Sequence, residues 1–289
     1  MKKIINKTLL GVIATIVTIS IILVSCEKGE SEVSNLNKVK SNVSTTTKIL
    51  EGITYGDICS ATQKHNQYIE EFAQIIDLQD DNYQEEIIKC ISKASMDNAS
   101  IEIRQQILTE LESRNFIPIS DFEYINNLNN YSDIIKKDRV IQLISIIEPY
   151  DFENLDFDMF SNKVDSIQNM AFDDLCNYDL LAVLAYTEQL RASFYCWMPK
   201  ELGGSGIGYN LFERGFSSVS KAKTDDVDPW VKAVGEAALA DGKSFSMSCL
   251  IIAFTGGTGL GPAAIAAALT SAEAGISTYI KEKKETDKD

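Results

Sequence analysis

The sequence predicts an all-α protein, a helical bundle that ends in a hydrophobic helical hairpin rich in glycine and alanine. Apolar residues recur at spacings of three and four along most of residues 49–200, which is the period of a helix that buries one face. No stretch of the sequence alternates apolar and polar residues between turn dipeptides, so strands are not expected to organise the fold. The 289 residues are 45% hydrophobic, enough to bury a substantial core.

The first 25 residues have the properties of an export signal. A basic start precedes an apolar run from Leu9 to Val24, which is short for a membrane span but suits a secretory signal. The run ends in Leu23-Val24-Ser25-Cys26, which resembles the lipobox of bacterial lipoproteins. The resemblance implies cleavage before Cys26 and acylation of that cysteine, and two or more acyl chains hold a protein stably on a membrane.

The resemblance at Cys26 also implies a location. The acidic residues that follow Cys26 resemble the export signal of some Gram-negative surface lipoproteins. We therefore expect a cell-envelope protein, anchored by its N-terminal lipid to the outer membrane and either surface-exposed or facing the periplasm. Residues 26–48 are polar and without a strong period, so they predict a tether between the lipid and the folded part.

Residues 49–200 form the predicted helical domain. Its first helix carries a stripe from Ile58 to Ile75, and Asp57 is placed to cap its start. Apolar spacing predicts two further helices within residues 83–94 and 103–111.

The second half of this domain contains four more predicted helices. Ser120 and Ser132 are the expected N-caps of the first two, and Pro149 ends the second of them. The third passes through Phe160, Val164 and Ile167, and the fourth runs from Asn177 toward Trp197. The connections between these helices are short, as in a bundle.

The C-terminal part differs in composition. Residues 201–228 are rich in glycine and serine at first and charged later, which predicts a linker. Residues 229–289 predict a hydrophobic helical hairpin and a charged tail. A short helix is expected from Pro229 to Ala240, followed by 29 uncharged residues from Ser244 to Ala272.

Small residues in this uncharged segment can let helix backbones approach closely. They are Gly257, Gly261, Ala263, Ala267 and Ser271. One interpretation is a hairpin packed on itself or on the bundle. The other is membrane contact, because the composition resembles the glycine-zipper segments of class II bacteriocins. A dinucleotide-binding loop is excluded, since only 28 residues follow Gly261, too few for the rest of such a fold; no cofactor is expected.

Composition and spacing limit the chemistry further. His65 is the only histidine and lies on the apolar stripe of its helix, so we expect a core histidine bonded to a carbonyl, with Asn66 on its solvent side. The cysteines lack metal-ligand spacing and the acidic clusters lack EF-hand spacing; we predict no catalytic and no metal-binding residues. The formal net charge is −15, and loss of a leader with three lysines and no acid makes it −18, which excludes nucleic acid as a partner.

The function predicted from these features is that of a non-enzymatic binding protein for an unknown protein or small ligand. The alternative is a membrane-active or bacteriocin-like lipoprotein that acts through residues 244–280. An extracytoplasmic hydrolase that uses paired carboxylates is the third hypothesis.

Overall fold

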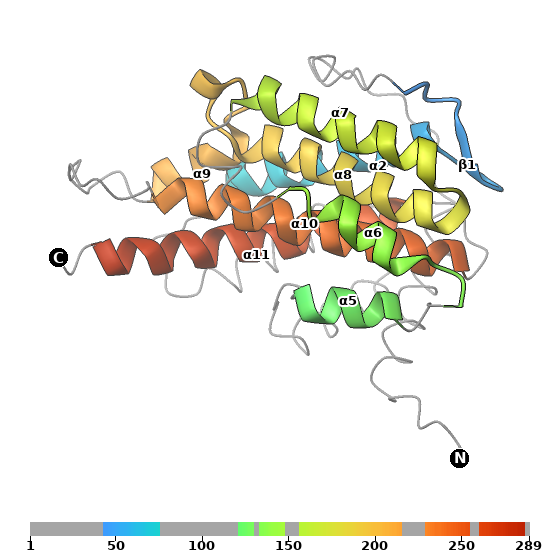
Figure 1. Ribbon diagram of the computed structural model, residues 1–289. Coiled ribbons are helices and arrows are strands. Elements are labelled where there is room, and N and C mark those ends of the chain that lie inside the picture. Colours follow the sequence, from blue (N-terminus) through green and yellow to red (C-terminus); the bar gives the residue numbers. More distant parts are fainter. Residues whose placement is uncertain are drawn as a thin grey trace, which may run out of the picture.

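The computed structural model describes residues 43–75, 121–129, 133–147, 156–215, 229–254 and 260–286. These residues are mostly helical, which confirms the predicted all-α class (Figure 1). The elements are β1 (Lys48–Leu50), β2 (Ile53–Thr54), α2 (Tyr55–Ile75), α5 (Asp121–Asn129), α6 (Lys137–Ile144), α7 (Phe157–Asp174), α8 (Asn177–Trp197), the 3-10 turn η3 (Lys200–Leu202), α9 (Ile207–Gly215), α10 (Pro229–Phe254) and α11 (Gly261–Thr286). The strands β1 and β2 form one short antiparallel hairpin.

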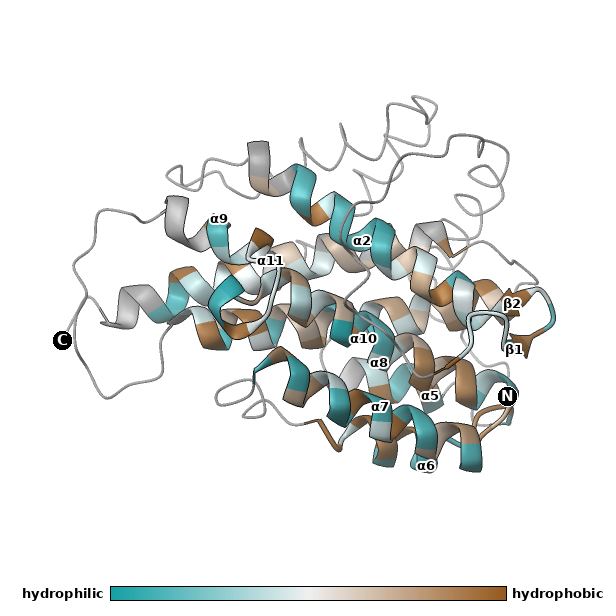
Figure 2. Cartoon of the chain, turned by 90° about the horizontal axis from the view of Figure 1, so that it is seen from above, coloured by the Kyte–Doolittle hydropathy of each residue, from teal (hydrophilic) through white to brown (hydrophobic). Residues whose placement is uncertain are grey.

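The central element is α8, which begins and ends at the predicted residues. Nearly every side chain of α8 from Asp179 to Trp197 is buried, because α2, α6, α7 and α10 all pack against it. Figure 2 shows α6 and α7 along one side of α8 and α2 along the other. A helix that lacks a polar face in this way must lie inside the protein.

The C-terminal hairpin shares its core with the rest of the bundle. Helix α10 packs against both α8 and α11, and α11 packs against α2. The predicted short helix ending at Ala240 is wrong, since α10 continues to Phe254. It does so past Gly242, which meets the ring of Tyr186 so closely that an added Cβ would lie 3.1 Å from it.

One helix among the described residues is long and apolar enough to cross a membrane. It is Trp230–Phe254, and 83% of its most apolar window is buried inside the bundle. The core helix of a globular protein has the same length and composition, so this finding does not by itself distinguish the two interpretations of the hairpin.

The start of α2 corrects the predicted cap. Thr54 is the N-cap residue, and its hydroxyl accepts from the backbone N–H of Asp57 at 3.3 Å. The carboxylate of Asp57 accepts in return from the backbone N–H of Thr54 at 2.7 Å. Asp57 is therefore the third helical residue of a reciprocal capping box and not the cap itself.

Part of the predicted linker is structured. Within residues 201–228, η3 extends to Leu202 and α9 covers Ile207–Gly215. The glycines here permit close packing: a Cβ at Gly204 would lie 2.3 Å from the carbonyl oxygen of Met198, and one at Gly208 would lie 2.3 Å from the ring of Trp197. The glycines that predicted a flexible linker are therefore present because the packing leaves no room for a side chain.

The other helix boundaries vary in their agreement with prediction. Helix α7 contains Phe160, Val164 and Ile167 as buried residues, as predicted. Helix α6 begins at Lys137, later than the predicted cap at Ser132, and the backbone N–H of Lys136 is bound by the carboxylate of Asp179 at 2.7 Å. The helices predicted within residues 83–94 and 103–111, the caps Ser120 and Ser132, and Pro149 lie outside the described residues.

Candidate functional site: two buried polar clusters and a surface groove

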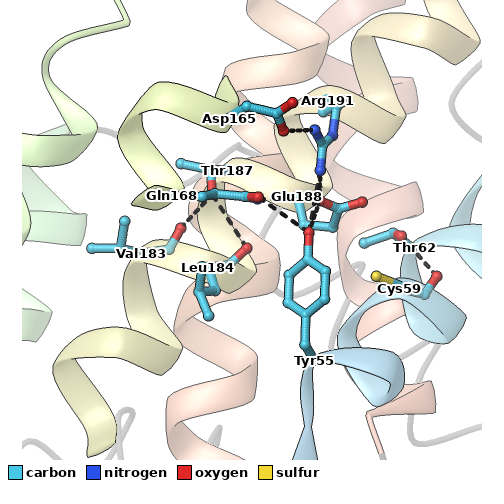
Figure 3. Close-up of polar contacts among 10 residues, drawn as sticks. All are labelled: Tyr55, Cys59, Thr62, Asp165, Gln168, Val183, Leu184, Thr187, Glu188 and Arg191. Carbon is cyan, nitrogen blue, oxygen red and sulfur yellow. Dashed lines mark hydrogen bonds and ion pairs between the residues drawn. The ribbon is translucent and has the colours of Figure 1, made fainter. Parts of the chain in front are cut away.

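Helix α8 carries polar side chains into the centre of the bundle, and they form two clusters. The Tyr55 cluster consists of Tyr55, Asp165, Gln168, Glu188 and Arg191 (Figure 3). The His65 cluster consists of His65, Asn66, Ser193, Asp241 and Ser271. Burial of such groups is costly unless each is paired, so the partners of each group decide what the clusters do.

Arg191 is the centre of the Tyr55 cluster. Its guanidinium is fully buried and donates through Nη1 to Oδ1 of Asp165 at 2.5 Å. Its Nη2 contacts the carboxylate of Glu188, one helical turn away, and donates to the phenol oxygen of Tyr55 at 3.2 Å. One cation is thus held by two carboxylates and a phenol, which come from three different helices (Figure 3).

Tyr55 and Gln168 complete this network. The phenol of Tyr55 donates to Oε2 of Glu188 at 2.6 Å. The amide of Gln168 donates to the same carboxylate oxygen at 3.2 Å and lies 3.2 Å from the hydroxyl of Thr187. Because Tyr55 is the first residue of α2 and Gln168 belongs to α7, the carboxylate of Glu188 joins both helices to α8.

The surroundings of the Tyr55 cluster keep the phenol of Tyr55 and the thiol of Cys59 protonated. Burial and then the charge of Glu188 raise the pKa of Tyr55. The same two causes raise the pKa of the nearby Cys59 thiol to about 12. Burial alone would lower the pKa of Arg191, but the charge and hydrogen bond of Glu188, together with the charge of Asp165, outweigh it and raise that pKa. At neutral pH the Tyr55 cluster therefore contains a charged guanidinium and a neutral phenol, and the nearby Cys59 is a neutral thiol.

The His65 cluster joins four helices. Nδ1 of His65 on α2 lies 2.8 Å from Oδ1 of Asn66, and Nε2 lies 2.9 Å from Oδ2 of Asp241 on α10. The hydroxyl of Ser193 on α8 donates to the same Oδ2. The hydroxyl of Ser271 on α11 lies near the carboxyl group and helps to lower its pKa, while Oδ1 of Asp241 has no hydrogen-bond partner. Burial raises the pKa of Asp241, and His65 and the two hydroxyls offset part of that rise.

The environment of His65 agrees with the sequence in one respect and not in another. His65 is buried, as expected of a core histidine. Asn66 is also buried and donates to the carbonyl oxygen of Ala192 at 3.0 Å, so its predicted position on the solvent side is wrong. The carbonyl oxygen that contacts His65 belongs to the side chain of Asn66. Its second partner, the carboxyl group of Asp241, lies 176 residues further along the chain.

A groove opens on the surface between the start of α10 and the end of α11. It has a volume of about 420 Å³ and a lining of mixed charge, which consists of Val231, Lys232, Gly235, Glu236, Thr278, Lys281 and Glu282. Lys232 and Glu282 form an ion pair across it, with Nζ 2.7 Å from Oε2. Trp230, which precedes the groove on α10, packs edge-on against Tyr209 of α9 at 5.5 Å.

The residues singled out from the sequence fall into three groups. Ala263, Ala267 and Ser271 are buried on α11, which is the position that helix packing requires. Gly261 is the first residue of α11. The lipobox residues Leu23, Val24, Ser25 and Cys26, together with Gly257, lie outside the described residues.

Metal-binding and disulfide chemistry is limited in the described part of the chain. The described residues contain no group of three or more histidine, cysteine or acidic side chains able to hold a metal ion. The four cysteines described there are free thiols, namely Cys59, Cys176, Cys196 and Cys249.

Sequence reasoning did not identify the two clusters. Helix α8 was recognised by its leucines, whereas Glu188 and Arg191 were not singled out. A signal was present, because a helix that is apolar on every side must be buried, and a charged residue within it then requires a buried partner. The identity of those partners, Tyr55 and Asp165, follows only from the tertiary structure.

Comparison of the whole chain with protein-family models, with curated proteins and with solved structures finds no match.

Proposed function

We propose that the protein is an exported lipoprotein, held in the cell envelope by acyl chains on Cys26, whose helical body binds a ligand and does not catalyse a reaction. The observation that carries this proposal is the burial of the reactive groups. Tyr55, His65 and Asp241, the titratable side chains at the centres of the two polar clusters, are buried within the helix packing, and the adjacent Cys59 thiol is half-buried. A catalytic group must instead reach its substrate within hydrogen-bond distance.

The groove between α10 and α11 is the proposed ligand site. Its lining offers both ammonium and carboxylate groups. This combination suits a ligand that itself carries polar groups of both charges, such as a polypeptide segment or a zwitterionic small molecule. Such a surface agrees with the acidic net charge of the chain, which disfavours nucleic acid and anionic lipid as partners.

The anchor is tested at Cys26. We expect metabolic labelling of cells with an alkyne fatty acid to mark the wild-type protein and the Cys26→Ser variant to carry no label, because the thiol is the atom acylated in bacterial lipoproteins. A Cys176→Ser variant, which removes an exposed thiol elsewhere, serves as the matched control and should retain the label. Labelling of Cys26→Ser at the wild-type level would contradict the proposal.

The ligand site is tested by photocrosslinking in cells. A benzophenone amino acid at Thr278, inside the groove, is expected to give a discrete adduct after irradiation. The same amino acid at Ser166, an exposed position on α7, is the control and should not give that adduct. Charge reversal by Lys281→Glu should weaken the adduct at position 278. Identical adducts from both positions would exclude the groove as the binding site.

A second candidate function is membrane action by the hairpin, which the apolar segment Trp230–Phe254 favours. The length of the uncharged segments weighs against it. The uncharged residues form only about half of each helix, Ser244 to Phe254 in α10 and Gly261 to Ala272 in α11. Arms of that length span about 17 Å each at 1.5 Å per residue, against about 30 Å of hydrocarbon.

A further inference from the structure

The hydrogen bonds of Asn66 determine which nitrogen of His65 carries a proton. Nδ2 of Asn66 lies 3.0 Å from the carbonyl oxygen of Ala192, and a carbonyl oxygen can only accept. The other atom of the amide, Oδ1, therefore faces Nδ1 of His65 at 2.8 Å as an acceptor. Nδ1 of His65 must donate this hydrogen bond, so it is protonated.

The other ring nitrogen of His65 faces a carboxyl group. Nε2 lies 2.9 Å from Oδ2 of Asp241, within ion-pair distance but without the geometry of a hydrogen bond, and neither side chain has exposed surface. If both atoms lacked a proton, two lone pairs would face each other and a buried negative charge would have no counterpart, which is costly. One proton on either atom removes both penalties. The pair is then an imidazolium with a carboxylate, or a neutral imidazole with a carboxylic acid, and both states hold the same number of protons.

The groups packed around the pair are neutral or lie at the surface. Ser193 of α8 donates its hydroxyl to Asp241, and the hydroxyl of Ser271 on α11 lies near the same carboxyl group. Cys196 of α8 is a titratable neighbour, and burial followed by the charges of Asp241 and Glu70 raises its pKa, so it remains a thiol. Glu70 of α2 is exposed to solvent. The number of protons bound at this site is therefore set by His65 and Asp241.

We propose that His65 and Asp241 share one proton through neutral pH and form a pH-dependent clasp between α2 and α10. In the unfolded chain the two side chains have pKa values of about 6.5 and about 3.9. The unfolded state therefore loses the proton above about pH 6.5, whereas the folded pair keeps it. Since the folded state then binds more protons, the stability of the protein falls as pH rises. The raised pKa of Asp241 in the folded state acts in the same direction, because it also makes the folded state bind more protons than the unfolded state.

The test is the direction in which stability changes with pH. Urea unfolding of the full chain in mild detergent is expected to show an unfolding equilibrium constant that rises by up to about tenfold per pH unit between pH 6.5 and 8. In Asp241→Asn the amide donates to Nε2 and His65 stays neutral in the folded state. The unfolded chain still takes up a proton below about pH 6.5, so the stability of this variant should rise with pH between 5.5 and 7.5.

A control variant and an NMR measurement complete the test of the proposal. Asp173→Asn removes an exposed carboxylate at the end of α7 and should retain the wild-type dependence on pH. Wild-type stability that is flat or rises between pH 6.5 and 8 would overturn the proposal. If Asp241→Asn does not fold, the pH dependence of wild-type stability still decides the proposal, and nitrogen-15 NMR of the wild-type chain tests the tautomer on which it depends, because the chain contains one histidine. A protonated Nδ1 is expected at every pH in this range, and a neutral ring protonated on Nε2 would exclude the clasp.

Discussion

Replacing Arg191 with methionine is expected to lower the free energy of unfolding by about 3–5 kcal/mol, because it leaves the buried carboxylate of Glu188 without a cation. Methionine has a similar length, so the loss arises mainly from charge and hydrogen bonding and not from a cavity. Asp165 would also lose its partner, but its side chain is 15% exposed and can be partly solvated. Urea unfolding followed by circular dichroism measures the change.

The surface pair of Arg139 and Asp174 provides the matched control for Arg191. Its two side chains are 35% and 42% exposed, and ion pairs of this kind contribute at most about 1 kcal/mol. Arg139→Met should therefore have a small effect. The double variant Arg191→Met with Glu188→Gln should lose less stability than the two single changes added together, since it removes both charges at once. Strict additivity would show that Glu188 and Arg191 do not interact.

Deleting residues 229–289 is expected to unfold the remainder of the protein. Helix α10 covers one side of α8, and α11 covers part of α2, so the deletion exposes the most apolar surface of the bundle to water. It also removes the partners of two buried side chains, since Tyr124 of α5 bonds Ser246 at 2.9 Å and His65 of α2 contacts Asp241 at 2.9 Å. Thermal unfolding of residues 26–228 should show no cooperative transition.

The same deletion distinguishes the two candidate functions. A control that lacks only residues 287–289 removes no part of α11 as the structure describes it and should unfold like the full chain. If residues 26–228 instead fold cooperatively, and the full chain but not this fragment releases dye from liposomes, the membrane-active function is supported and the binding function is contradicted. Loss of folding, with no dye release by the full chain, supports the hairpin as part of the core.

Local sequence patterns were sufficient for several elements. Helices α7 and α8 lie where their apolar spacing predicts, and the all-α class is correct. Apolar periodicity is a property of about three helical turns of sequence, so it can be recognised without knowing which elements pack against the helix. The predictions were wrong where the same sequence pattern can have two different structural causes. The glycines at 204 and 208 indicated flexibility but serve close packing, and the residues after Ala240 did not end α10.

The partners of buried polar groups could not be predicted in this way. Tyr55 and Glu188 are 133 residues apart in sequence, and no spacing rule connects residues at such a separation. His65 was correctly expected in the core from the apolar stripe of its helix, but Asp241 lies on a helix whose predicted end came before that residue. A long-range contact depends on how the helices pack, which is a property of the whole chain.

The sequence by itself therefore determined the helical class, the positions of α7 and α8 and the lipobox-like residues before Cys26, because each depends on neighbouring residues only. The tertiary structure decided that α8 lies at the centre, that its charged residues are paired and that Ala263, Ala267 and Ser271 are buried in helix packing. An uncharged helix has the same composition whether protein or lipid surrounds it. Composition therefore cannot distinguish the two; in the described part of this chain, 83% of the most apolar window of Trp230–Phe254 is buried inside the bundle.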